Sequence, residues 1–113
     1  MTKPYGYHVT RAANLDNIRQ QGLQPKIPKD YGVDGDIEGV YLFKSYDDAQ
    51  NALMNWLGER IEEWEEETGE EYDEVLLTVD LSGLEEHLID SVEYEWICVA
   101  PITPDRIVDV VAT

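Results

Sequence analysis

The sequence predicts a small α+β domain with two main helices. Two segments carry the end signals or the hydrophobic spacing of helices, and five short segments rich in β-branched and aromatic residues indicate strands. Their order is β-α-β-α-β-β-β, with both helices in the first half, whereas an α/β fold alternates the two types throughout. A chain of 113 residues has room for one core, so we expect a single domain over residues 1–113.

Residues 5–10 form the first predicted strand, because this run is rich in aromatic and β-branched side chains. A short helix is expected to follow. Asn14 is suited to cap its N-terminus, and Gly22 is suited to end it in a left-handed conformation. The first unit is therefore a strand, a short helix and a stop, with His8 inside the strand.

Residues 23–39 contain two prolines and three glycines and show no sustained hydrophobic period, which predicts a long surface loop. Loops longer than about 12 to 15 residues in a compact domain are usually functional or mobile. Lys26 and Lys29 lie in this loop and are two of only eight basic residues. The loop is therefore one of the few places where an anionic ligand meets positive charge.

Residues 39–44 form the second predicted strand, in which Tyr41 and Phe43 share one face. Ser45 is predicted to cap the second helix, with Asp48 three residues later as in a capping box.

The second helix carries a continuous apolar stripe at the helical period, which predicts the main core helix. The stripe consists of Ala49, Leu53, Trp56, Leu57, Ile61 and Trp64. The exposed side of this helix runs into residues 59–74, where ten of sixteen residues are Asp or Glu. Like charges on adjacent turns repel, so the helix should fray near Thr68 and Gly69.

The last part of the chain predicts three strands. Residues 74–81 indicate a strand that is buried on both faces, and residues 93–100 and 107–111 indicate two more. Between them, residues 84–90 suggest one helical turn. Glu95 stands near the start of an apolar strand, where a carboxylate is costly to bury unless its charge is used.

Composition excludes several classes of site. A single cysteine, Cys98, excludes an internal disulfide, and together with two histidines far apart in sequence it argues against a metal site. Residues 1–4 lead into a strand with no apolar stretch, and the longest apolar runs are only as long as strands. We therefore expect neither a signal peptide nor a membrane span, and a cytoplasmic location.

The net charge of −17 repels nucleic-acid phosphates, so direct binding in a nucleic-acid groove is disfavoured. Three interpretations stay open: a solvated acidic surface of the halophilic type, an imitation of nucleic acid that occupies a basic protein, and an acidic patch for one basic partner. We favour the first, because Ile61 and Trp64 continue the apolar stripe through the acidic segment and tie it to the core.

Three separated pieces of the sequence together resemble the ADP-ribosyltransferase-like domains of the His-Tyr-Glu type. The pieces are Tyr7-His8-Val9-Thr10, then Gly39-Val40-Tyr41-Leu42, and finally residues 95–104, which begin with Glu95 and run on through Ile97 to Pro101. In that family, three strands bring a His, a Tyr and a Glu together. The resemblance implies a small split β-sheet, and it extends over the chain outside the acidic segment and the tail.

The resemblance also implies a function, the transfer of ADP-ribose from nicotinamide adenine dinucleotide (NAD) to a macromolecular target. NAD is then a substrate, and no metal is required. Glu95 would stabilise the developing oxocarbenium ion and hold a ribose hydroxyl, with His8 and Tyr41 as the other catalytic residues. His8 would donate a hydrogen bond to the second ribose or to the nicotinamide amide. Thr10 would bind the dinucleotide beside it.

Tyr41 would stack on the nicotinamide ring, with Phe43 on the same face. We therefore predict that His8, Tyr41 and Glu95 converge on one cleft. Glu93 matches the Glu-x-Glu pair of the arginine-modifying members, but those members carry an Arg on the first strand where this chain has His8. The target molecule therefore stays open. The alternative from another functional class is a non-catalytic acidic protein that binds a basic partner.

Overall fold

A computed structural model describes residues 4–26 and 37–112, and within them the chain forms a small α+β fold, as predicted. The strands are β1 (Tyr5–Arg11), β2 (Val40–Phe43), β3 (Glu74–Asp80), β4 (Leu88–Val92), β5 (Glu95–Cys98) and β6 (Ile107–Ala112). The α-helices are α1 (Leu15–Gln21), α2 (Tyr46–Met54) and α3 (Trp56–Thr68). Short 3₁₀ helices cover Ala12–Asn14, Glu85–His87 and Pro104–Arg106.

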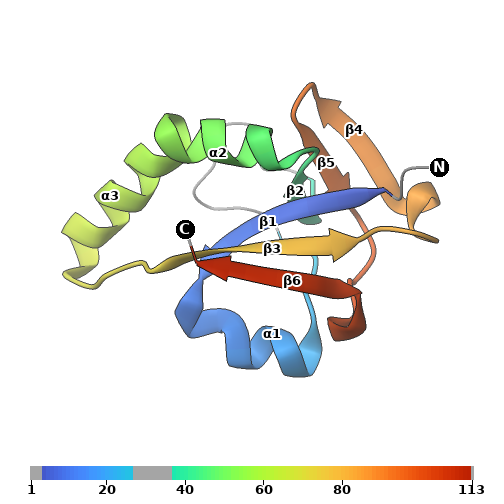
Figure 1. Ribbon diagram of the computed structural model, residues 1–113, viewed down its shortest axis with the longest axis horizontal. Coiled ribbons are helices and arrows are strands. Elements are labelled where there is room, and N and C mark those ends of the chain that lie inside the picture. Colours follow the sequence, from blue (N-terminus) through green and yellow to red (C-terminus); the bar gives the residue numbers. More distant parts are fainter. Residues whose placement is uncertain (1–3, 27–36, 113) are drawn as a thin grey trace.

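The strands form one antiparallel sheet in the order β4-β5-β2-β1-β3-β6. The sheet has its shortest strand pairing in the middle, between β1 and β2. β1 pairs with β3 along its whole length, from Tyr5 to Arg11, but it pairs with β2 only where Tyr7 faces Phe43. Figure 1 shows the consequence: β4 and β5 run at a steep angle to β1, β3 and β6. The predicted split therefore takes the form of one continuous sheet whose two halves diverge.

Helices cover both faces of the sheet, α1 on one and α2 with α3 on the other (Figure 1). The α1 face holds the larger apolar cluster, which includes Ile18, Leu42, Leu77 and Cys98. The opposite face holds a smaller cluster of buried side chains, namely Phe43, Ala49, Ala52 and Leu76. Apolar side chains on both faces explain why the middle strands lack the alternation of a strand with one solvated face.

The ends of α1 differ from the prediction in their chemistry. Asn14 occupies the N-cap position, but its side chain makes no capping bond and instead donates from Nδ2 to Thr10 Oγ1 at 3.1 Å. Gly22 has φ 74° and ψ −163°, which is a positive φ outside the left-handed helical region. The reason is that Leu23 pairs immediately with Ile102 in an antiparallel bridge, so the chain extends as soon as the helix ends.

The predicted single core helix is two helices, because the chain bends at Asn55, with φ −128° and ψ −117°. The predicted Ser45 cap is confirmed: its Oγ accepts from the backbone N–H of Asp48 at 3.0 Å. A glycine makes the bend possible, since a Cβ on Gly58 would lie 2.1 Å from the Leu53 carbonyl oxygen.

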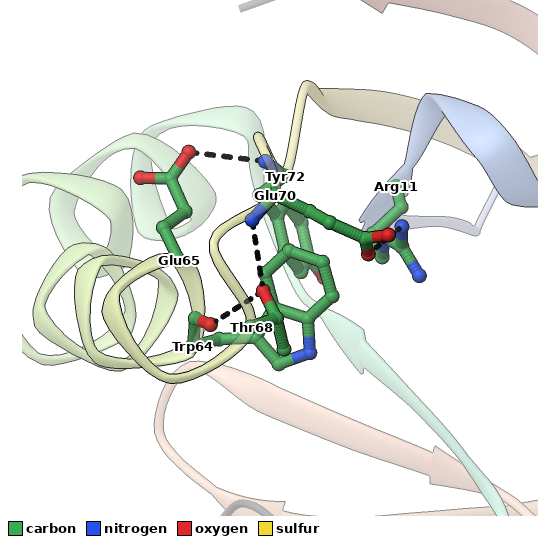
Figure 2. A network of polar contacts seen from close by, with 6 residues as sticks. All are labelled: Arg11, Trp64, Glu65, Thr68, Glu70 and Tyr72. Carbon is green, nitrogen blue, oxygen red and sulfur yellow. Dashed lines mark hydrogen bonds and ion pairs between the residues drawn. The ribbon is translucent and has the colours of Figure 1, made fainter.

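The acidic end of α3 is attached to the sheet by the contacts shown in Figure 2. Arg11 on β1 lies over the ring of Trp64, 4.3 Å from its centroid, and forms an ion pair with Glu70 at 3.6 Å. Glu65 Oε2 accepts from the backbone N–H of Tyr72 at 3.0 Å. The helix remains intact to Thr68, where the fraying was expected, and Gly69 ends it in a left-handed conformation.

The C-terminal strands were partly predicted. The predicted buried strand is β3, and the last predicted strand is β6. The predicted helical turn is the 3₁₀ helix Glu85–His87, but β4 directly after it was missed. β4 forms a hairpin with β5, and its two-residue turn at Glu93 and Tyr94 shortens the strand predicted over residues 93–100.

Part of the predicted loop at residues 23–39, including Lys29, lies outside the described residues. At its ends, Lys26 and Gly39 form an antiparallel bridge. No helix in the described part of the chain is long and apolar enough to cross a membrane.

Gly22 and Gly69 provide a matched test of the close contact at the end of α1. Both have a positive φ near 70°, but a Cβ on Gly22 would lie 2.0 Å from the Ile102 carbonyl oxygen, whereas a Cβ on Gly69 would meet nothing within 4 Å. We expect Gly22→Ala to lower the free energy of unfolding by about 1–3 kcal/mol more than Gly69→Ala does. Urea denaturation of the two variants measures the difference. Equal losses would show that the positive φ alone requires the glycine.

Candidate functional site

A cavity lies where β1 and β2 separate, on the α1 side of the sheet. Its volume is about 250 Å³. Residues of β1, α1, β2 and the segment after α1 surround it. They are His8, Thr10, Asn14, Asn17, Ile18, Gly22, Leu23, Gln24, Lys26, Gly39, Val40 and Tyr41. The pocket therefore contains three of the five predicted site residues: His8, Thr10 and Tyr41.

His8 bridges the separated strands. Its Nδ1 lies 2.9 Å from the Tyr41 carbonyl oxygen, which accepts only, so Nδ1 carries the proton. Burial lowers the pKa of His8 below its ordinary value, and the bond to Tyr41 opposes this effect more weakly. The ring is therefore neutral at neutral pH, and Nε2 is a hydrogen-bond acceptor. This corrects the prediction that His8 donates to a ligand: toward the pocket it accepts.

The rest of the pocket wall mixes the apolar side chains of Ile18, Leu23 and Val40 with polar groups and one cation. Thr10 is buried, and its hydroxyl accepts from Asn14 Nδ2 at 3.1 Å. Gln24 is held near the end of α1 because its Nε2 donates to the Gln21 carbonyl at 2.7 Å. Lys26 is fixed at the rim by its backbone bridge to Gly39. Hydroxyl, amide and ammonium groups together suit a ligand with sugar hydroxyls and a negative charge.

Tyr41 has two roles in holding this region together. Its backbone carbonyl accepts from His8, and its hydroxyl donates to the Ile37 carbonyl at 2.7 Å. The second bond ties the ring to the segment that precedes β2. Tyr41 is two residues from Phe43 on β2, so its ring lies on the face opposite the His8 side chain and only its backbone carbonyl meets His8.

Glu95 and Phe43 do not line the pocket, and the sheet register gives the reason. Directly paired residues share a face, and Tyr7 pairs with Phe43, which pairs with Glu95. His8 follows Tyr7 and therefore faces the other side. The prediction that His8, Tyr41 and Glu95 converge on one cleft is wrong: the side chains of His8 and Glu95 lie on opposite faces of the sheet, and Tyr41, two residues before Phe43, has its ring on the Glu95 face.

Glu95 lies on the α2 face in a partly apolar environment. Burial raises the pKa of its carboxyl above the ordinary value, while a hydrogen bond with Ser91 acts in the opposite direction. Phe43, its neighbour on β2, is buried and stacks on Tyr94 with ring centroids 6.3 Å apart. Glu95 is thus a half-buried carboxylate beside aromatic rings, the environment expected of a carboxylate that acts on a ligand.

Several pocket residues were not predicted as site residues. Asn14 and Gly22 were interpreted only as helix ends, and Asn17 and Gln24 were not considered. Their positions in the sequence could have identified them. They are polar residues at the two ends of a short helix that follows the strand of His8 and Thr10, and such a helix packs with one side toward that strand. Lys26 was singled out as a place where an anionic ligand could meet positive charge, and it lines the pocket.

No protein-family model matches the chain, and no curated protein matches it either. Within residues 4–26 and 37–112, no group of three or more His, Cys, Asp or Glu side chains is arranged to hold a metal ion.

The lowered pKa of His8 predicts a pH dependence of stability. Below about pH 6.5 an unfolded histidine gains a proton, but folded His8 resists it, so the free energy of unfolding falls as the pH decreases through this range. Protonation of the many carboxylates adds its own pH dependence, so the informative quantity is the difference between wild type and His8→Gln. We expect the wild type to lose more stability between pH 7 and pH 5. The exposed His87, changed to Gln, is the control, and a loss that His8→Gln leaves unchanged would contradict the prediction.

The raised pKa of Glu95 predicts the opposite sign. Folded Glu95 binds a proton more readily than the unfolded chain does, so ionising it destabilises the fold as the pH rises through its pKa. We expect Glu95→Gln to raise the melting temperature at pH 7 relative to wild type. Glu93→Gln removes the same charge from an exposed position two residues away and controls for the general reduction of charge. An equal rise in both variants would refute a specific effect of burial at Glu95.

Proposed function

We propose that the protein is an NAD-dependent ADP-ribosyltransferase-like protein whose α1-side pocket binds the adenosine part of NAD. The observation that carries this proposal is the pocket at the separation of β1 and β2, whose wall contains His8 with its Nδ1 held by the Tyr41 carbonyl. The resemblance of the three sequence pieces around His8, Tyr41 and Glu95 supports the identity of the ligand.

The pocket suits one half of a dinucleotide better than the whole. Pockets that enclose a complete drug-sized ligand occupy about 300–1,000 Å³, and this one has about 250 Å³. We infer that His8 Nε2 accepts from a ribose hydroxyl and that Asn14 and Gln24 offer further polar contacts. Lys26 at the rim supplies positive charge for the diphosphate. The nicotinamide half then lies outside this pocket.

The position of Glu95 sets a requirement on this proposal. For transfer, the nicotinamide ribose must reach the α2 face, where Phe43 and Glu95 share one row of the sheet. The ligand would pass where β1 and β2 are unpaired, beside the bond between His8 and Tyr41. The proposed site is therefore two half-sites joined through the divergence of the sheet, in place of the single cleft predicted from the sequence.

The proposed reaction follows from the chemistry of the C1′ carbon. The bond from C1′ to the pyridinium nitrogen breaks, and nicotinamide leaves as a neutral molecule with the bonding electron pair. A nucleophilic atom of the macromolecular target forms the new bond to C1′ and releases its proton to solvent. The Glu95 carboxylate would stabilise the positive charge that develops on the ribose and hold its hydroxyl.

One rival function has a specific observation in its favour. Glu62, Glu63, Glu66 and Glu67 are all exposed on α3, and the chain carries a net charge of −17. A non-catalytic acidic protein that binds a basic partner would need only this surface. The two functions differ in whether NAD binds, which makes binding the first experiment.

Isothermal titration calorimetry tests the pocket, with NAD, ADP-ribose and nicotinamide as separate ligands. We expect NAD and ADP-ribose to bind with similar affinity, because the pocket contacts the half that they share. His8→Ala should weaken both about tenfold, the loss of one well-placed hydrogen bond, and His87→Ala should weaken neither. No binding of NAD or ADP-ribose by the folded wild type would overturn the proposal and favour the acidic binding protein.

Incubation with labelled NAD and a cell extract tests the transfer. Glu95→Gln should abolish label transfer and leave NAD binding nearly unchanged, because Glu95 lies outside the pocket. The matched control Glu93→Gln should keep the activity. Transfer that survives both Glu95→Gln and His8→Ala would refute the assigned catalytic residues.

A further inference from the structure

A second cavity lies on the other face of the sheet, where α2 bends into α3. It has a volume of about 200 Å³ and opens between the helix bend and the β4–β5 turn. Six residues line it: Asp48, Asn51, Ala52, Asn55, Trp56 and Tyr94. None of them lines the pocket around His8, so the two cavities have separate walls.

Aromatic rings form one wall of this cavity. The centroids of Trp56 and Tyr94 are 6.4 Å apart, and both rings contact Phe43 behind them, at 6.2 and 6.3 Å. The bend at Asn55 sets the direction in which α3 begins, so it places Trp56 opposite Tyr94. Because Phe43 is buried, the rings rest on the core and form a firm surface.

Polar side chains of α2 and of the bend after it also line the cavity. Asp48 stands in the first turn of α2, and Asn51 and Asn55 follow on the same side of the helix. Asn55 Nδ2 donates to the Asn51 carbonyl at 2.7 Å. This bond fixes the Asn55 amide with its NH₂ toward the helix and its carbonyl oxygen away from that bond. The lining of the cavity thus combines aromatic rings with a carboxylate and amide side chains.

We propose that this cavity binds an arginine side chain of a partner protein. Its volume is below that of pockets for complete small molecules, which favours a single side chain. A guanidinium stacks on aromatic rings through its face and donates in its plane to a carboxylate and carbonyl oxygens. The molecule already uses such contacts, with Arg11 over Trp64 and Lys44 over Trp96. The net charge of −17 attracts a basic partner to this surface.

The cavity is on the same face of the sheet as the proposed catalytic carboxylate, since its Tyr94 stacks on Phe43, which pairs with Glu95. If the proposed transfer occurs, an arginine held here is positioned beside the reacting ribose and belongs to the target protein. The binding itself is independent of that function, because no nucleotide takes part in it. Failure of NAD binding and failure of arginine binding are therefore separate results.

Nuclear magnetic resonance titration with N-acetyl-arginine methylamide tests the proposal, with the Trp56 indole N–H signal as the readout. We expect saturable shifts at Trp56 and much smaller shifts at Trp64 and Trp96. The citrulline analogue has the same shape without the charge and should not bind. The lysine analogue should bind several times more weakly, since an ammonium lacks the planar stacking surface. Equal affinity for the arginine and citrulline analogues, or for the arginine and lysine analogues, would overturn the proposal.

Four variants locate the site. Asp48→Asn should weaken arginine binding about tenfold, because it removes a charge-assisted hydrogen bond. Glu66→Gln removes one charge from an exposed position on α3 and should change the affinity by less than about twofold. Tyr94→Phe keeps the ring and should keep most of the affinity, whereas Tyr94→Leu should lose it several-fold. Equal losses for Asp48→Asn and Glu66→Gln would show that general electrostatics, and not this cavity, binds the probe.

Discussion

The hydrogen bond from His8 Nδ1 to the Tyr41 carbonyl joins two strands that pair at only one other position. A buried carbonyl that loses its strand partner is costly to leave unsatisfied, and the histidine ring supplies the missing donor across the gap. β1 and β2 can therefore separate while the Tyr41 carbonyl keeps a hydrogen-bond donor, and this separation creates the pocket. The same bond fixes the tautomer of His8, so the geometry that stabilises the fold also decides what the ring offers to a ligand.

The acidic segment depends on a different constraint, the attachment of α3 to β1 and β3. Ile61 is buried, and Trp64 is covered by the Arg11 guanidinium, so this side of the helix is held in place. Its many carboxylates then lie on the outer side, where water and salt screen their repulsion. This arrangement agrees with a solvated acidic surface, and it explains why the helix continues to Thr68 despite the repulsion.

The sequence was most informative where one local pattern determines the structure. The apolar run of β3 and the Ser45 cap were predicted because each depends on neighbouring residues alone. The bend at Asn55 was missed because the apolar stripe continues in phase across it, and the bend shows only in the Asn55 backbone angles and in the close approach of Gly58 to the Leu53 carbonyl. β4 was missed because most of its side chains are exposed and give no alternating pattern. For the site, motif order pointed to His8 and Thr10, which line one pocket, and to Tyr41, whose backbone carbonyl bonds to His8. It could not place Glu95, since the face of a strand residue depends on a register set by distant pairings.

The two proposed sites lie on opposite faces of one sheet. The negative electrostatic field of the protein disfavours the anionic ligand of the first site and favours the cationic ligand of the second. A net charge of −17 raises the local concentration of cations and lowers that of anions such as a dinucleotide. Lys26 at the rim of the first pocket offsets this repulsion where the diphosphate would lie, whereas Asp48 in the second cavity adds to the attraction of a cation. An acidic surface is therefore compatible with binding NAD only if the pocket shields the ligand from the distant carboxylates. In the proposed site, salt and water would screen the exposed, distant carboxylates more than the contacts made inside the pocket.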